Sequence, residues 1–235
     1  MFAFSDDANQ PRRRPPVPSA LRDLARPVVA AAARTLPVTQ SLSSILPRGA
    51  LRRGSVSVVS GSQGSGAISL ALALAAEASA QGHWCGVVGI SDPGATAMSE
   101  VGMDLRRVLF TPEPSKRWLE VTAELLDGVE LLIVRVQAAV AFSAARRLSA
   151  RARERRAALI IVTEHRQYWP LPADLGLSIR SSTWMGIGRG DGHLRSRRLE
   201  LEVAARGEHL RLVSVWVPSQ DGAILVAHGH GHGDA

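Results

Sequence analysis

Hydrophobic and polar positions along the chain fall into blocks that predict a parallel α/β core. Near-continuous Val, Ile and Leu runs predict buried strands, and segments with helical periodicity lie between them. The predicted strands of this part are Ser55–Ser60, Trp84–Ser91, Arg107–Thr111, Val129–Val136 and Ala157–Glu164. The predicted helices are Ala67–Gln81, Thr96–Val101, Pro114–Leu126 and Ala138–Arg156. Strands without polar alternation are typical of a parallel sheet covered by helices on both faces.

The pattern changes after Pro172. Three further strands are predicted at Leu175–Arg180, Arg198–Ala204 and Leu210–Val217, and short glycine-containing turns join them. Short connections permit only antiparallel pairing. The predicted fold class is therefore α/β, with a mainly parallel sheet flanked by helices and a C-terminal antiparallel β-meander.

Proline, glycine and charge divide the chain into four parts. Residues 1–19 form a basic, proline-rich arm, and residues 20–53 hold a helix (predicted over Ser19–Thr35) and a connector. Residues 54–217 form the core, and residues 218–235 form a disordered tail. The tail carries His228, His230 and His232 between glycines, a tract that binds metal incidentally because nothing fixes its ligands.

Composition narrows the setting. A hydrophobic content of 46% in 235 residues excludes a largely disordered chain, and no apolar run is long enough for a transmembrane helix. The start lacks a secretory signal and Cys85 is the single cysteine, so a cytoplasmic protein with an inert core thiol is expected. The net charge of +7 comes from arginine, because Lys116 is the only lysine. The scarcity of lysine beside abundant arginine and alanine is typical of a GC-rich coding bias. The arginine count is therefore only weak evidence for nucleic-acid binding.

A glycine-rich segment follows the first core strand and precedes the first core helix, which is the place of a phosphate-binding loop. The residues of this degenerate loop are Gly61, Ser62, Gln63, Gly64, Ser65, Gly66, Ala67 and Ile68. Ala67 and Ile68 stand where such loops carry lysine and a serine or threonine, so the phosphate cation and the magnesium ligand are both missing. Two other interpretations are a purely structural turn and anion binding by backbone N–H groups.

The strand Leu131–Val136 gives independent evidence that the nucleotide site is degenerate. Nucleotide-hydrolysing enzymes of this class hold magnesium with an acidic residue at the end of such a strand, and this chain has Arg135 there. A guanidinium repels a metal ion. We therefore predict no catalytic residues, no metal and no cofactor.

Several segments resemble the RecA family. LPRGALRRGSVSVVSGSQGSG is similar to the RecA segment that leads into its phosphate loop, and LLIVRVQAAV is similar to its metal-carboxylate strand. Asp92 lies near the place of the family's catalytic glutamate, and little room remains for the two DNA-binding loops. Within the family, the stretches around Trp118 and Arg146–Leu159 resemble the ImuA type.

The resemblance implies a non-catalytic RecA-like adaptor in DNA-damage-induced mutagenesis and translesion synthesis. It implies protein partners: an ImuB-type Y-family polymerase homologue, an error-prone replicative-type polymerase and RecA itself, with self-association as a further expectation. Weak or absent direct DNA binding and no membrane contact are expected. The alternatives are a nucleotide-dependent DNA-repair ATPase and a basic DNA-binding module.

Two arginine-rich segments are candidate interaction surfaces. The first is a helix whose basic residues are Arg146, Arg147, Arg151, Arg153, Arg155 and Arg156. It is either a solvated outer face or an interaction surface for DNA or an acidic partner. The second segment, Trp184–Arg198, is interpreted as a flexible hairpin turn with solvated charge rather than a phosphate-backbone contact.

Overall fold

The computed structural model describes residues 34–91, 94–185, 196–217 and 225–227. Residues from Thr35 onward form one unit, and the segment up to Arg34 is a separate unit. The predicted arm 1–19 and nearly all of the predicted helix Ser19–Thr35 lie outside the described residues. Every described helix and strand belongs to the unit that begins at Thr35.

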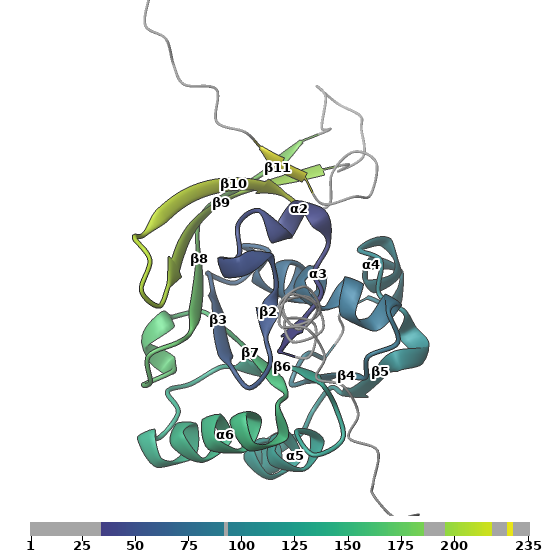
Figure 1. Cartoon of the computed structure of the whole chain (residues 1–235), viewed down its shortest axis with the longest axis vertical. Coiled ribbons are helices and arrows are strands. Elements are labelled where there is room, and N and C mark those ends of the chain that lie inside the picture. Colours follow the sequence, from purple (N-terminus) through teal and green to yellow (C-terminus); the bar gives the residue numbers. More distant parts are fainter. Residues whose placement is uncertain (1–33, 92–93, 186–195, 218–224, 228–235) are drawn as a thin grey trace, which may run out of the picture. The chain divides into compact units, whose positions relative to one another are not determined.

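The described strands build one large sheet and one small sheet. The large sheet consists of β3 (Val56–Ser60), β4 (Cys85–Val88), β5 (Val108–Thr111), β6 (Leu131–Val136), β7 (Ala158–Thr163), β8 (Leu175–Met185), β9 (Ser196–Ala205), β10 (Arg211–Trp216) and β11 (Leu225–Ala227). Their order is β11-β10-β9-β8-β3-β7-β6-β4-β5 (Figure 1). All pairs from β8 to β5 are parallel, and the pairs from β8 outward to β11 are antiparallel. The predicted α/β fold with a mainly parallel sheet and a C-terminal antiparallel set is confirmed.

Helices lie on both faces of the sheet. The α-helices are α2 (Gln40–Ser43), α3 (Ala67–Ala80), α4 (Ala95–Glu100), α5 (Trp118–Leu125) and α6 (Phe142–Arg155). The 3-10 turns are η1 (Pro47–Gly49), η2 (Leu105–Arg107), η3 (Ser115–Arg117) and η4 (Arg166–Tyr168). Helices α5 and α6 lie together at the bottom of the view in Figure 1, whereas α3 and α4 cover the opposite face. Among the described residues, no helix is long and apolar enough to cross a membrane.

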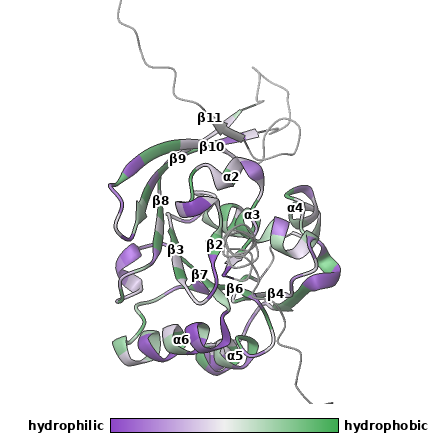
Figure 2. Ribbon diagram, viewed as in Figure 1, coloured by the Kyte–Doolittle hydropathy of each residue, from purple (hydrophilic) through white to green (hydrophobic). Residues whose placement is uncertain are grey.

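The central strands alternate their side chains between two apolar layers. In β6, Leu131 and Ile133 pack in the layer of α3, while Leu132 and Val134 pack in the layer of α5 and α6. All four side chains are fully buried, which explains why β6 shows no polar alternation in the sequence. In Figure 2, hydrophilic and hydrophobic positions alternate along the α6 ribbon, as expected for a helix with one buried side.

Helix α3 is buried nearly all round, as its sequence predicts. Leu70, Leu72 and Leu74 are buried although they do not share one face. Alanines fill most of the other positions, so the helix backbone can lie close to the sheet and to its other neighbours.

Helix α6 begins later than the predicted Ala138. The backbone N–H of Val140 donates to the carbonyl of Tyr168 at 2.9 Å, which ties this segment to η4. Ala141 is extended, with φ −60° and ψ 139°, and helical geometry starts at Phe142. A tertiary hydrogen bond therefore overrides the helical preference of Ala138 and Ala139.

The segment 36–53, predicted to be a connector, is part of the core. It forms β1 (Thr35–Leu36) and β2 (Leu51–Arg52), which pair antiparallel, with α2 and η1 between them. Leu36, Leu42 and Ile45 are buried in the same apolar layer as α3. The Arg211 guanidinium also donates to the Ile45 carbonyl at 3.0 Å. The boundary of the folded unit therefore lies near Thr35 rather than at the predicted residue 54.

The C-terminal part differs from the prediction in two places. Strand β8 continues to Met185, five residues beyond the predicted end, because β9 pairs with it over that length. The predicted disordered tail contributes β11, whose Leu225–Ala227 pairs antiparallel with Ser214–Trp216. An additional strand at this edge satisfies backbone groups that β10 would otherwise expose.

Candidate functional site

The glycine-rich loop lies at the carboxyl end of β3 and opens α3, as predicted. Gly64 and Gly66 have φ of +76° and +99°, in the left-handed region that favours glycine. The loop ends of parallel strands are the usual place of ligand sites in open α/β sheets. The loop therefore has the position and the backbone of a phosphate-binding turn.

Arg197, which lies on β9, contacts this loop. Its guanidinium donates to the carbonyl oxygen of Gly64 and, at 2.6 Å, to the hydroxyl of Ser182. A Cβ atom on Gly66 would lie 3.0 Å from the guanidinium carbon. Arg197 is only 7% exposed, so the prediction of solvated charge over Trp184–Arg198 is wrong for this residue.

The buried guanidinium has no acidic partner among the described residues. Its carbon atom lies 5.0 Å from the centre of the Trp184 ring, at a distance typical of cation–π contact. Burial lowers the pKa of Arg197, because removal from water disfavours the charged form. Arginine keeps its proton at neutral pH in spite of this shift, so the loop holds an internal cation.

A pocket of about 290 Å³ adjoins the loop. Its lining residues are Gly61, Ser62, Gln63, Gly64, Gly66, Ala67, Ile68, Ser69, Arg135, Val162, Thr163, Glu164 and Arg197. The lining brings the degenerate loop together with Arg135, two features that the sequence placed far apart. Ser65 lies beside it with a buried hydroxyl that has no hydrogen-bond partner among the described residues, and a Cβ on Gly61 would overlap that hydroxyl.

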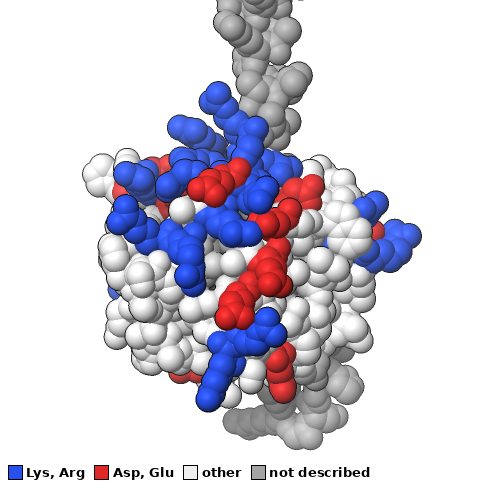
Figure 3. Space-filling view, turned by 90° about the horizontal axis from the view of Figure 1, so that it is seen from below, with Lys and Arg blue, Asp and Glu red and all other residues white. Residues whose placement is uncertain are grey.

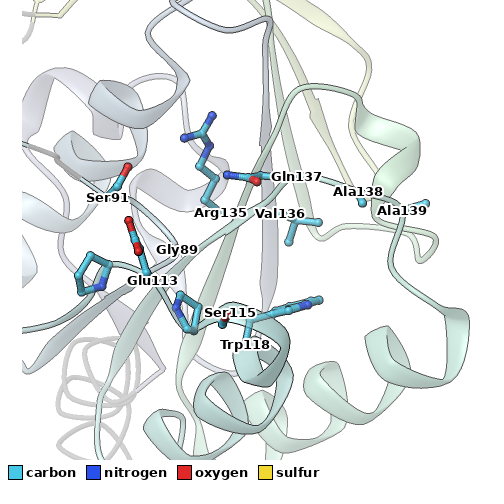
Figure 4. A pocket seen from close by; sticks show the side chains of 12 residues that line it. Gly89, Ser91, Glu113, Ser115, Trp118, Arg135, Val136, Gln137, Ala138 and Ala139 are labelled. Carbon is cyan, nitrogen blue, oxygen red and sulfur yellow. The ribbon is translucent and has the colours of Figure 1, made fainter.

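Arg135 also lines a second pocket of about 480 Å³, at the carboxyl ends of β4, β5 and β6. Ser91 and Glu113 lie on the side opposite Gln137, and Arg135 stands between them (Figure 4). No hydrogen bond or ion pair joins the Arg135 guanidinium to another described residue. Gly89 allows the strands to approach here, because a Cβ at this position would lie 3.0 Å from the Arg135 carbonyl oxygen.

The side chains around the loop do not fit a magnesium-bound phosphate. Ala67 and Ile68 supply neither the cation nor the hydroxyl that such a ligand needs. Among the described residues, Glu164 is the one carboxylate in the loop pocket, against the two guanidinium groups of Arg135 and Arg197. This donor set repels a divalent cation.

The six arginines of the α6 region differ in their contacts. Arg151 and Arg155 both donate to the Asp127 carboxylate, with shortest distances of 2.6 and 3.1 Å. Arg146, Arg147 and Arg153 are exposed and make no ion pair with any described residue. Arg156 ends the helix in the left-handed region, with φ +57°. Arg151 and Arg155 therefore link α6 to the turn after α5, whereas no described residue neutralises the charges of Arg146, Arg147 and Arg153.

The Asp127 ion pairs should give the protein a measurable acid dependence. Hydrogen bonds from Arg151, with the charges of Arg151 and Arg155, hold the pKa of the Asp127 carboxyl below its ordinary value. A lowered folded-state pKa stabilises the fold at neutral pH, and this stabilisation is lost as the pH falls through that pKa. The Asp127→Asn variant should therefore be less stable than the parent protein at neutral pH but not in acid.

Urea denaturation of both proteins, at about pH 7 and about pH 3, measures this difference. The stability gap should narrow at the lower pH. A gap of equal size at both values would show that Asp127 acts through something other than its charge.

Some predicted candidates fall outside the described residues. These are Asp92, residues 186–195 of the predicted hairpin turn, and the tail histidines His228, His230 and His232. In the part of the chain that the structure describes, no group of three or more His, Cys, Asp or Glu side chains could hold a metal ion. Cys85 is fully buried, and burial raises the pKa of its thiol to about 12, so it remains protonated at neutral pH. This agrees with the inert core thiol expected from the sequence.

Comparison with known proteins places part of this chain in a described family. A family model for the MT3502 N-terminal domain matches residues 44–170, just over half of the chain. The matched range includes the loop, Arg135 and α6, and it ends before Arg197. The uncharacterized protein Rv3395c of Mycobacterium tuberculosis is 37% identical over 111 residues. These residues cover 46% of this chain and 54% of the mycobacterial protein, so the match spans about half of that relative.

Proposed function

The chain belongs to the family of the MT3502 N-terminal domain, and from its own residues we propose that it is a non-catalytic adaptor with a RecA-like fold. The observation that carries this proposal is the pair of guanidinium groups at the loop. Arg197 contacts the Gly64 carbonyl and Arg135 lines the same pocket, where a nucleotide-hydrolysing enzyme needs a magnesium site.

The RecA-like part of the proposal rests on topology and sequence together. The loop strand β3 lies in the middle of a parallel sheet and leads directly into α3, and β6 carries Arg135 two strands away. The segments that resemble RecA fall on these elements. The continuation into antiparallel strands β9 to β11 adds a surface beyond the parallel core.

The adaptor would act without a nucleotide cycle. A protein that switches with ATP needs different contacts with the bound and the hydrolysed nucleotide. With Arg197 against the loop and Arg135 at the metal position, the chain would hold its partners constitutively. The partners that the ImuA-type resemblance implies are an ImuB-type protein, an error-prone replicative-type polymerase and RecA, with self-association as a further contact.

Isothermal titration of the full chain with magnesium and ATP tests the non-catalytic part of the proposal. We expect no binding in the micromolar range, because the lysine and the metal ligands are replaced. Saturable micromolar binding that depends on magnesium would overturn it. The Arg135→Leu variant serves as a control, since it removes the repelling charge without adding a metal ligand.

Affinity purification of the tagged chain from DNA-damaged cells of its own species tests the adaptor part. Recovery of an ImuB-type protein or an error-prone polymerase is expected. Purification of the chain without any component of the mutagenesis machinery would overturn the assignment, whatever the nucleotide titration shows.

A further inference from the structure

The outer face of α6 carries a stripe of residues that the fold itself does not use. Positions 142, 146, 149 and 153 recur every three to four residues, so they lie on one side of the helix. Phe142 is 59% exposed, and Arg146 and Arg153 are exposed without an ion pair to any described residue. We call Phe142, Arg146, Ser149 and Arg153 the α6 stripe.

An apolar surface adjoins the N-terminal end of the stripe. Ala138, Ala139 and Ala141 are exposed in the segment that precedes Phe142. The buried side of the helix consists of Ala144, Ala145, Leu148 and Ala152, so Phe142 takes no part in the core. An exposed phenylalanine beside small apolar residues provides a contact for an apolar side chain of a partner.

Acidic side chains border the basic ones on this face of the molecule. Figure 3 shows a band of acidic residues beside the arginines in the view toward α5 and α6. Glu120 and Glu124 on α5 are exposed, and Asp127 lies between α5 and α6 with Arg151 and Arg155. Nucleic acid laid along this face would bring its phosphates close to those carboxylates, whereas a narrow protein segment can follow the stripe alone.

We infer that the α6 stripe is a docking site for an acidic, amphipathic segment of a partner protein. The segment places an apolar side chain against Phe142 and carboxylates on Arg146 and Arg153. These two arginines are seven residues apart, which is about 10 Å along the helix. Two carboxylates about two helical turns apart in the partner match that spacing. This inference rests on the proposed adaptor function and assigns it a surface and a class of partner.

The proposed partner contacts Arg146 and Arg153 of the α6 stripe, whereas Arg151 and Arg155 of the same helix contact Asp127. Arg151 and Arg155 already share the Asp127 carboxylate, so a partner would have to compete with Asp127 for them. A double substitution at either pair removes the same charge from the same helix. This gives matched variants for the test, Arg146→Gln/Arg153→Gln and Arg151→Gln/Arg155→Gln.

Fluorescence anisotropy of the full chain with a labelled synthetic peptide tests the inference. The probe is a peptide of about 18 residues, about five helical turns, with leucines on one face and glutamates on the adjoining face. A peptide with glutamine in place of every glutamate serves as its control. We expect the acidic peptide to bind the parent protein more tightly than the glutamine peptide.

The Arg146→Gln/Arg153→Gln variant should bind the acidic peptide about tenfold more weakly, since two partly exposed ion pairs are lost. Phe142→Ala should weaken binding of both peptides, and Arg151→Gln/Arg155→Gln should change it by less than about twofold. Equal losses in the two double variants would show that net charge alone attracts the peptide, which overturns the inference. Thermal melting of each variant establishes that it is folded.

A labelled DNA duplex tested with the same variants distinguishes the other class of partner. Tighter binding of duplex than of peptide, lost in Arg146→Gln/Arg153→Gln, would overturn the inference in favour of a nucleic-acid surface.

The purification from damaged cells distinguishes a failure of the α6 stripe as the docking site from a failure of the proposed adaptor function. If the stripe variant recovers the same mutagenesis proteins as the parent, the stripe is wrong and the adaptor function stands. If the parent recovers none, the adaptor function fails independently of the peptide result.

Discussion

Replacing Leu148 with alanine is expected to lower the free energy of unfolding by about 3 kcal/mol. Leu148 is fully buried, and the other buried residues of α6 are alanines at positions 144, 145 and 152. It is therefore the single large side chain that α6 places in its apolar layer. Its truncation leaves a cavity between the helix and the sheet that these small neighbours cannot fill.

Urea denaturation followed by circular dichroism measures the effect. Leu212→Ala provides a matched control, because Leu212 is 72% exposed on β10 and its truncation should change the stability by less than about 0.5 kcal/mol. Equal effects of the two substitutions would contradict the packing described for α6. Because Leu148 holds the helix that carries the α6 stripe, this variant should also show weaker peptide binding near its unfolding transition.

Replacing Gly89 with alanine is expected to cost about 2 to 3 kcal/mol. Gly89 follows β4 with φ +75°, a conformation that a residue with a Cβ rarely adopts. The added Cβ would also lie 3.0 Å from the backbone carbonyl oxygen of Arg135, which belongs to the neighbouring strand and cannot rotate away. Strain from the backbone and strain from the contact therefore add.

Gly128→Ala tests whether the loss of stability expected for Gly89→Ala comes from its position in the fold rather than from replacing any glycine with alanine. A Cβ at Gly128 would meet no atom within 4 Å, and the change should alter the stability by less than about 0.5 kcal/mol. Thermal unfolding of the two variants gives the comparison. A Gly89→Ala protein as stable as the parent would mean that β4 and β6 separate more easily than their packing indicates.

The parallel core is predictable from the sequence because its strands are buried on both faces. Leu131–Val134 and Ala158–Ile161 read as continuous apolar runs, and both form central strands whose side chains alternate between two apolar layers. The start of α6 was not predictable in the same way. It depends on the hydrogen bond between Val140 and Tyr168, two residues that the sequence gives no reason to bring together.

The loop and Arg135 were identified from spacing, and the structure places them on one pocket. Arg197 was missed, although the sequence holds a signal for it. Arg197, Leu199, Leu201 and Val203 alternate with period two, and all four are buried in β9. The predicted strand begins at Arg198, so the prediction left Arg197 in a turn and did not include it in this alternation. A charged residue in phase with the buried positions of a strand is a reason to search for its partner.

A single lysine lies in the turn that borders the second pocket, and it can be labelled selectively. Lys116 is the only lysine of the chain and lies exposed in η3, between Ser115 and Trp118, which both line that pocket. An amine-reactive fluorophore therefore has one side-chain target, besides the N-terminal amine. A dye attached there would lie on the same turn as two residues that line the pocket, so its emission can be tested as a reporter of what enters the pocket without any engineered cysteine.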